Sequence, residues 1–187
     1  TFNVIIGQLI PNYGDVILDD KLVTRLPMSI RSRLGIGYLP QEPSIFRNLN
    51  VLENLDIALS RSISKKIDRI KRRDELITEF NLSPFLHRKG FQLSGGERRR
   101  CEVARALSLG ANGPNILLLD EPFAGIDPLA VADLQGLIKQ LQRRGMGILI
   151  TDHNVRETLA ITDRSYILSQ GSILASGTSK EVSENPM

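Results

Sequence analysis

The sequence predicts an α/β fold built around a mostly parallel sheet. Apolar runs of strand length recur along the chain, for example ILLL at 116–119 and GILI at 147–150. Segments with helical spacing lie between such runs, and strands that alternate with helices form parallel sheets covered by helices. The composition, with 41% hydrophobic and 24% charged residues over 187 positions, is that of a globular protein with room for one core and a smaller lobe.

The first 41 residues predict the opening part of this core. Segment 1–9 has its apolar residues at helical spacing, which indicates a helix. Residues 11–20 indicate a turn followed by a strand, and residues 34–41 a strand that ends at Pro40. We therefore expect the first part of the core to span residues 1–41.

Residues 42–100 differ in kind, because their patterns are helical, in 51–60 and again in 64–80. In the second stretch Ile67, Ile70 and Ile77 fall on one face. The same stretch carries a basic face, which is typical of a solvated helix surface: Lys65, Lys66, Arg69, Arg72 and Arg73. We predict an inserted helical subdomain over 42–100.

From Cys101 onward the alternation of strand and helix returns, which predicts the second part of the core over 101–187. Residues 115–122 and 145–152 each predict a buried parallel strand. The helix predicted over 128–144 opens with Pro128 and carries an apolar stripe. A short helix at 154–162 and two short strands around a glycine turn at 164–177 follow.

Bulk properties exclude several classes. A net charge of only +3 gives no support to a nucleic-acid role. A single cysteine allows no internal disulfide and indicates a reducing compartment. The longest apolar runs are far shorter than the roughly 20 residues that a membrane span needs. If the protein serves a membrane, we expect it to do so as a peripheral subunit.

Polar residues follow three predicted strands, at the edge where ligands of open α/β sheets bind. An apolar strand that runs into Asp120 is the arrangement that holds Mg²⁺ in nucleotide hydrolases, and Glu121 would then polarise an attacking water. Gln41 could help to coordinate Mg²⁺, and His153 could hydrogen-bond a γ-phosphate or the water. The structural alternatives are exposed acids at the end of a buried strand and a solitary structural Gln or His.

The stretch LSGGERRR at 93–100 combines a helix start with two glycines. Ser94 and Glu97 form the S-x-x-E pattern of a capping box, which explains those two residues without a ligand. It does not explain Gly95 and Gly96, each of which disfavours a helix by about 1 kcal/mol relative to Ala. Close approach of a phosphate to bare backbone at a helix N-terminus would explain them. For the three arginines at 98–100 we expect a solvated helix face.

These motifs together resemble the ATP-binding subunit of ABC transporters. LSGGE, ILLLDEP, AGID, TDH and YLPQ match the signature motif, the Walker B strand with its catalytic Glu, the D-loop, the switch histidine and the Q-loop. The motifs stand in family order over residues 38–153, and the resemblance extends over essentially the whole chain. Within the family the chain looks most like the ATP-binding subunit of the lipopolysaccharide-export system, and Glu97, where most relatives carry Gln, fits that subfamily.

The resemblance implies a P-loop NTPase (RecA-like) core, the cofactors ATP and Mg²⁺, and a head-to-tail homodimer. Residues Ser94, Gly95 and Gly96 would hold the γ-phosphate of ATP bound to the other copy, and Asp127 would reach across the dimer. Mg²⁺ would be organised by Asp120 and Gln41. The resemblance further implies that Glu121 activates water and that His153 senses the γ-phosphate.

The implied partners are integral membrane permease subunits, with no nucleic acid and no direct contact with the cargo. The implied location is cytoplasmic, at the inner face of the inner membrane. The segment around Phe46, Leu49 and Leu55 is the expected membrane contact, with lobe core as an open alternative for these residues.

One family motif is absent: the chain has no G-x-x-x-x-G-K-[ST] loop, the Walker A motif that cradles phosphates. Segment 1–9 resembles the helix that follows this loop. We therefore expect a fragment whose N-terminal part is missing, and which alone binds ATP weakly and is inactive.

The alternatives are a degenerate non-catalytic subunit, an importer subunit for amino acids or another small solute, and a DNA-repair ATPase. The compact interval between Gln41 and Ser94 lacks the heptads and Cys pairs that the last class carries there.

Overall fold

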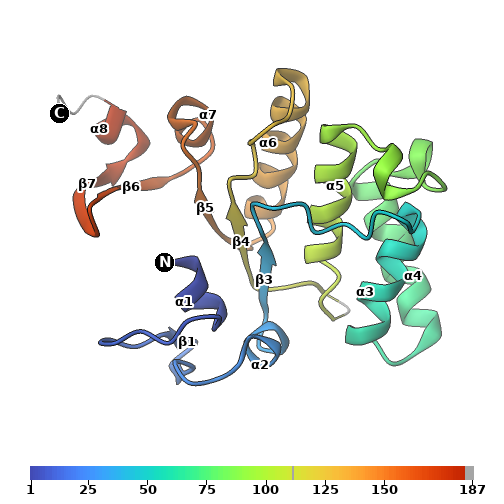
Figure 1. Ribbon diagram of the computed structural model, residues 1–187, viewed down its shortest axis with the longest axis horizontal. Coiled ribbons are helices and arrows are strands. Elements are labelled where there is room, and N and C mark those ends of the chain that lie inside the picture. Colours follow the sequence, from blue (N-terminus) through green and yellow to red (C-terminus); the bar gives the residue numbers. More distant parts are fainter. Residues whose placement is uncertain (111, 184–187) are drawn as a thin grey trace.

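The computed structural model describes residues 1–110 and 112–183. At its centre lies a three-stranded parallel sheet of β3 (Ile36–Leu39), β4 (Ile116–Asp120) and β5 (Gly147–Thr151), in the order β3–β4–β5 (Figure 1). Leu118 of β4 is paired with Tyr38 on one side and with Leu149 on the other. The predicted α/β fold with a parallel sheet is confirmed.

The central strand β4 is buried on both faces. Leu117 and Leu119 belong to the large apolar core that the helices form, whereas Leu118 belongs to a smaller cluster on the other face, with Phe2 and Ile36. Successive side chains of a strand point to opposite faces, so a strand that is buried on both faces requires an unbroken apolar run.

Strand β5 is less buried than its sequence predicts. Ile148 and Ile150 pack against the large core, but Leu149 points to the opposite face and is 40% exposed. Within the described residues β5 is an edge strand, and helix α6 (Pro128–Arg143) covers one of its faces. The prediction of a fully buried strand over 145–152 is therefore wrong for one face.

The helices of the predicted lobe gather on one side of the sheet, away from the C-terminal hairpin (Figure 1). They are α3 (Val51–Ser62), α4 (Lys66–Glu79), two short 3₁₀ helices (Ser83–Phe85 and Gly90–Gln92) and α5 (Gly95–Ala106). Leu55 is fully buried here and is lobe core, whereas Phe46 is 45% exposed. Of the two alternatives for Leu55, membrane contact and lobe core, the structure supports lobe core.

The N-terminal segment is shorter in regular structure than the sequence predicts. Helix α1 (Phe2–Ile6) ends at Gly7, which adopts a left-handed conformation with φ 85°. In place of the strand predicted in 11–20, the structure has a short antiparallel hairpin of β1 (Ile17–Leu18) and β2 (Lys21–Leu22), each strand two residues long. Helix α2 (Met28–Arg33) follows. The buried guanidinium of Arg31 donates to the carbonyls of Val4 and Ile5 and so ties α2 to α1.

The C-terminal part contains α7 (Val155–Leu159), β6 (Arg164–Ser169), β7 (Ser172–Thr178) and α8 (Ser179–Ser183). Strands β6 and β7 form an antiparallel hairpin around Gln170 and Gly171, as the glycine turn predicts. Residues 184–187, at the end of the predicted second part of the core, lie outside the described residues. Among the described helices, none has the length and apolar character that crossing a membrane requires.

Candidate functional site

The carboxyl ends of the three parallel strands bring three of the predicted site residues together. Gln41 follows β3, Glu121 follows β4, and His153 follows β5. The side-chain amide of Gln41 donates to Glu121 Oε2 at 2.9 Å, and His153 Nδ1 lies 3.3 Å from the same oxygen. Glu121 is therefore the common partner of groups from two neighbouring strands.

Asp120 is oriented by two hydroxyl groups. Thr151 Oγ1 donates to one carboxylate oxygen of Asp120, and the phenol of Tyr38 donates to the other at 3.3 Å. Burial and the charge of Asp120 raise the pKa of Tyr38, so the phenol remains a proton donor. These contacts hold the Asp120 carboxylate at the end of β4.

The backbone of Glu121 is strained. Its φ is 44°, in the left-handed region, which costs a non-glycine residue on the order of 1–3 kcal/mol. The surrounding structure holds this conformation, since the Glu121 N–H donates to the Thr151 carbonyl at 2.7 Å and its own carbonyl accepts from Arg99 Nη2 at 3.0 Å. The left-handed backbone at Glu121 ends the extended conformation of β4 directly after Asp120.

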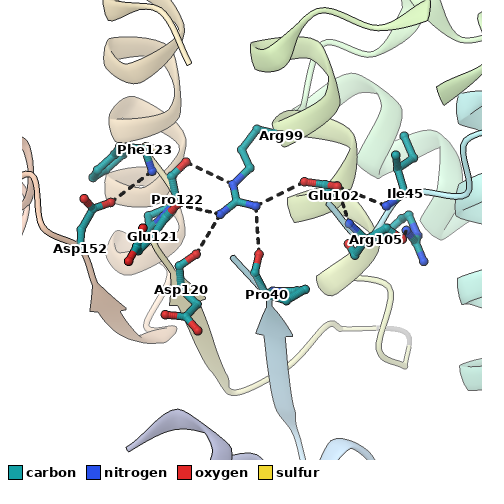
Figure 2. Close-up of polar contacts among 11 residues, drawn as sticks. Pro40, Ile45, Arg99, Glu102, Arg105, Asp120, Glu121, Pro122, Phe123 and Asp152 are labelled. Atoms are coloured by element: carbon teal, nitrogen blue, oxygen red, sulfur yellow. Dashed lines mark hydrogen bonds and ion pairs between the residues drawn. The ribbon is translucent and has the colours of Figure 1, made fainter. Parts of the chain in front are cut away.

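Arg99 contradicts the expected solvated face at 98–100. Its side chain is 8% exposed and its guanidinium lies between the ends of β3 and β4 (Figure 2). Four carbonyl groups accept from it: those of Pro40, Asp120, Glu121 and Pro122. The sequence carried a signal for this burial, because Arg99 is three positions after Gly96 and four before Val103, both buried on α5.

Asp152 is a second residue that the motifs did not single out. Its side chain is fully buried and accepts from the backbone N–H of Phe123 at 3.2 Å (Figure 2). It also accepts from the backbone N–H of Asn154 at 2.8 Å. The bond from Phe123 joins the loop after β4 to the loop after β5, and the bond from Asn154 lies within the loop after β5. Asp152 thereby holds the backbone next to the exposed His153 in place.

The predicted capping box at the start of α5 is confirmed. The Glu97 N–H donates to Ser94 Oγ at 3.3 Å, and the Ser94 N–H donates to Glu97 Oε2 at 2.9 Å. Arg88 lies 3.3 Å from the Glu97 carboxylate and balances its charge. The cap is local, since both of its residues belong to the same helical turn.

The structure supplies a second reason for Gly95 and Gly96, besides the proposed phosphate. A Cβ at Gly96 would lie 2.6 Å from the Cβ of Ala130, and a Cβ at Gly95 would lie 3.2 Å from the Gly125 carbonyl oxygen. The start of α5 thus packs directly on the start of α6. Asp127, the predicted D-loop residue, caps that helix by accepting from the Ala130 N–H at 3.0 Å.

The donor set at the strand ends fits Mg²⁺ better than a transition metal. No cluster of three or more His, Cys, Asp or Glu side chains that could hold a metal occurs in residues 1–110 and 112–183. Mg²⁺ does not require one, because it is typically held by one or two protein oxygens together with phosphates and waters. The oriented Asp120 carboxylate and the amide oxygen of Gln41 are ligands of this kind.

Comparison with known families decides the class of protein. The sequence profile of the ABC transporter family matches residues 1–124. The chain belongs to the ABC transporter family. The nucleotide-binding and ATP-hydrolysing class that the motifs predict is therefore confirmed, and ATP-binding domains of this family work as dimers with membrane partners.

Individual ABC relatives agree with this assignment. The chain is 46% identical over all 187 residues to the lipopolysaccharide export system ATP-binding protein LptB of Acidithiobacillus ferridurans, of which it covers 76%. It is 50% identical to LptB of Haemophilus influenzae, with 97% of the chain and 75% of the relative covered. The predicted resemblance to the lipopolysaccharide-export subfamily is confirmed.

Solved ABC structures share the fold. An ATP-binding cassette of an ABC transporter, MJ1267, superposes with a TM-score of 0.86 at 28% identity, covering 97% of this chain and 76% of the other. A nucleotide-free ATP-binding cassette superposes with a TM-score of 0.85 at 28% identity, covering 98% and 78%. The predicted P-loop NTPase fold is thereby confirmed.

Proposed function

We propose that this protein is the ATP-hydrolysing subunit of an ABC transporter that exports lipopolysaccharide. The identity of 46–50% to proteins named LptB supports the cargo. The observation that carries the hydrolytic role is the convergence of Gln41 and His153 on the Glu121 carboxylate. A small-solute importer and a degenerate subunit remain the alternatives to be tested.

Glu121 is proposed as the general base. Its carboxylate would accept a proton from the water that attacks the γ-phosphate, and a positioned base of this kind contributes about 10²–10⁴-fold to a rate. Gln41 and His153 orient the carboxylate through Oε2 and leave Oε1 for the water. The exposed His153 ring, with 74% of its side chain accessible, is free to contact the γ-phosphate on its other edge.

Asp120 and Gln41 would hold Mg²⁺, which when bound neutralises charge on the phosphate oxygens. Within this chain the role of Asp120 is to present an oriented carboxylate. The two hydroxyls of Thr151 and Tyr38 hold its position before any ligand arrives.

Ser94, Gly95 and Gly96 are proposed to contact the γ-phosphate of ATP held by a second copy in a head-to-tail homodimer. The N–H groups in the first turn of a helix have no carbonyl partner within that helix. In α5 one of them, the Glu97 N–H, donates to the Ser94 hydroxyl oxygen. The hydroxyl proton of Ser94 therefore remains available as a donor, and the helix dipole favours an anion at this end. Asp127 is proposed to reach across the same interface.

The proposed partners of the dimer are integral membrane permease subunits, at the cytoplasmic face of the inner membrane. Exposed Phe46, in the segment that follows Gln41, is the proposed contact with them. No nucleic acid and no direct contact with the cargo are part of the proposal. The division into core residues 1–41 and 101–187 and a helical subdomain over 42–100 belongs to it as well.

The substitution Glu121→Gln tests the hydrolytic role in the protein produced from its natural reading frame. We expect phosphate release to fall by at least about 100-fold, while ATP-induced dimerisation, measured by light scattering, persists because binding groups are unchanged. Glu75→Gln, at an exposed acid on α4, is the control and should leave turnover unchanged. Unimpaired turnover in Glu121→Gln would reject the role of Glu121.

The cargo is tested by purifying the membrane subunits that accompany the protein and reconstituting the complex in vesicles. ATP-dependent release of lipopolysaccharide from the vesicles is the expected result. Accumulation of an amino acid or another small solute would support the importer, and a wild-type protein without ATP hydrolysis would support the degenerate subunit.

A further inference from the structure

Helix α5 contains a buried ion pair that the proposed mechanism does not use. Arg99 Nη1 lies 3.3 Å from Glu102 Oε2, and the two side chains are 8% and 1% exposed. Burial lowers the pKa of Arg99, and the charge of Glu102 opposes that shift. Charges are tolerated at such depth only where pairing and hydrogen bonds satisfy them, so each partner depends on the position of the other.

The Arg99 side of the pair is attached to the hydrolytic loop. Its Nη2 donates to the carbonyls of Asp120 and Glu121 at 3.0 Å each, and Nε donates to that of Pro122 at 3.1 Å. Nη1 donates to the carbonyl of Pro40 at 3.1 Å, directly before Gln41. Figure 2 shows the planar guanidinium set between these groups. Arg99 thus fixes the strained backbone from which the Glu121 carboxylate projects.

The Glu102 side of the pair is attached to the segment proposed to contact the permease. Glu102 Oε1 accepts from the backbone N–H of Ser44 at 2.7 Å and from that of Ile45 at 3.2 Å. Phe46 follows directly, and the guanidinium of Arg105 lies 4.7 Å from the centre of its ring. Oε1 of Glu102 therefore binds segment 44–45, and Oε2 binds the guanidinium that holds the hydrolytic loop.

We infer that Glu102 and Arg99 are positioning residues that transmit displacement of segment 44–46 to the backbone of Glu121. The inference rests on the proposed function, because it supplies the path by which a membrane partner would act on hydrolysis. The path is three consecutive hydrogen-bonded contacts, from the Ser44 and Ile45 N–H groups to Glu102, from Glu102 to Arg99, and from Arg99 to the Glu121 carbonyl. Neither side chain can move alone without leaving a buried charge unpaired.

The substitution Glu102→Gln breaks the middle contact and leaves its shape in place. The amide oxygen still accepts from Ser44 and Ile45, but the amide nitrogen cannot accept from Arg99. We expect amide hydrogen exchange at Glu121, which Glu102 does not touch, to accelerate by about tenfold in the nucleotide-free protein. In the ATPase assay kcat should fall by about tenfold while KM for ATP changes by less than about twofold, since neither residue is proposed to touch the nucleotide.

Glu79→Gln is the matched control. Its carboxylate is also mostly buried, at 10% exposure, and pairs with Arg144 at 2.6 Å, but it has no contact with the strand ends. Exchange at Glu121 should be unchanged in this variant. The inference is overturned if Glu102→Gln accelerates exchange only at Ser44 and Ile45, or if Glu79→Gln produces the same change at Glu121.

Arg99→Lys reads the path from its other end and covers the case in which Glu102→Gln does not fold. A lysine keeps the charge but cannot bridge the carbonyls, so exchange at Ser44 and Ile45 should accelerate although Arg99 touches neither. Unchanged exchange at these two amides would overturn the inference. Because exchange is measured without nucleotide, a wild-type protein that fails to hydrolyse ATP would reject the proposed function and leave this test valid.

Discussion

The two halves of the proposed nucleotide site are built in different ways. The hydrolytic half, around Glu121, is assembled from residues far apart in sequence, since Gln41 and Glu121 are separated by 80 positions. The phosphate-binding half, at the start of α5, is assembled within one helical turn by the box of Ser94 and Glu97. The first half therefore depends on the sheet and on long-range contacts, whereas the cap of the second depends on α5 itself.

This difference predicts which perturbations each half tolerates. Loss of sheet packing should disturb the hydrolytic half first, because its groups come from β3, β4 and β5. Loss of a local cap should disturb only the start of α5. The contact between Gly96 and Ala130 is the exception, since there the local half rests on a tertiary contact.

The largest effect on stability is expected from Leu119→Ala in the strand that carries Asp120. Leu119 is fully buried, and removing such a side chain destabilises a protein by about 2–5 kcal/mol. Leu149→Ala in β5, where the side chain is 40% exposed, should lower the free energy of unfolding by less than about 1.5 kcal/mol. Urea denaturation measures both values. Equal losses would show that β5 is as deeply packed as β4.

The next effect is expected from Gly96→Ala. The added methyl group would lie 2.6 Å from the Ala130 side chain, and overpacking of this kind destabilises by about 1–3 kcal/mol, offset in part by the better helix propensity of Ala. Gly136→Ala on α6 is the control, because nothing lies within 4 Å of its added Cβ. That variant should be more stable than the wild type by up to about 1 kcal/mol. If both variants gain stability, the contact between Gly96 of α5 and Ala130 of α6 leaves room for a methyl group.

A smaller effect is expected from Ser94→Ala. Loss of an N-cap oxygen destabilises by about 1 kcal/mol, whereas Glu97→Gln keeps an acceptor for the Ser94 N–H and should stay within about 0.5 kcal/mol of the wild type. Hydrogen exchange should accelerate in the first turn of α5 and remain unchanged at Glu121. Acceleration at Glu121 would show that the two halves are coupled through the cap.

The smallest effect at neutral pH is expected from Cys101, which lies on α5 between the cap and Glu102. Burial raises the pKa of its thiol from 9.0 to about 12. Above pH 9 the folded protein therefore binds a proton that the unfolded chain has lost, and stability falls by about 1.4 kcal/mol per pH unit from this group.

Cys101→Ala should flatten the pH dependence of stability above pH 9 and leave it unchanged below. In the wild type, Ellman's reagent at pH 8 should react only as the protein unfolds in urea. Rapid reaction of the folded protein would show that α5 opens locally. The phosphate-binding half would then be less stable than the burial of its residues indicates.

Some features of the molecule followed from short stretches of sequence. The capping box, the strand that runs into Asp120 and the glycine turn at 170–171 are each encoded by neighbours within a few positions, and the structure has all three. The burial of Arg99 was not predicted, because a run of three arginines is typical of a solvated face, although its helical spacing from Gly96 and Val103 places it on the buried side of α5. Its partners are carbonyl groups of Pro40 and of residues 120–122, which the helix sequence does not contain.

The sequence by itself determined the alternation of strands and helices, the family motifs and the residues at each strand end, because hydrophobic periodicity and capping act between near neighbours. Only the tertiary structure decided that Glu121 adopts a left-handed backbone and that Leu149 of β5 stays half-exposed. It also decided that Glu102 and Arg99 together link segment 44–45 to the loop after β4. These outcomes depend on which distant groups meet. The Arg99 side chain shows the reason most directly: its burial is favourable only because Glu102 and four backbone carbonyls from two other segments converge on it.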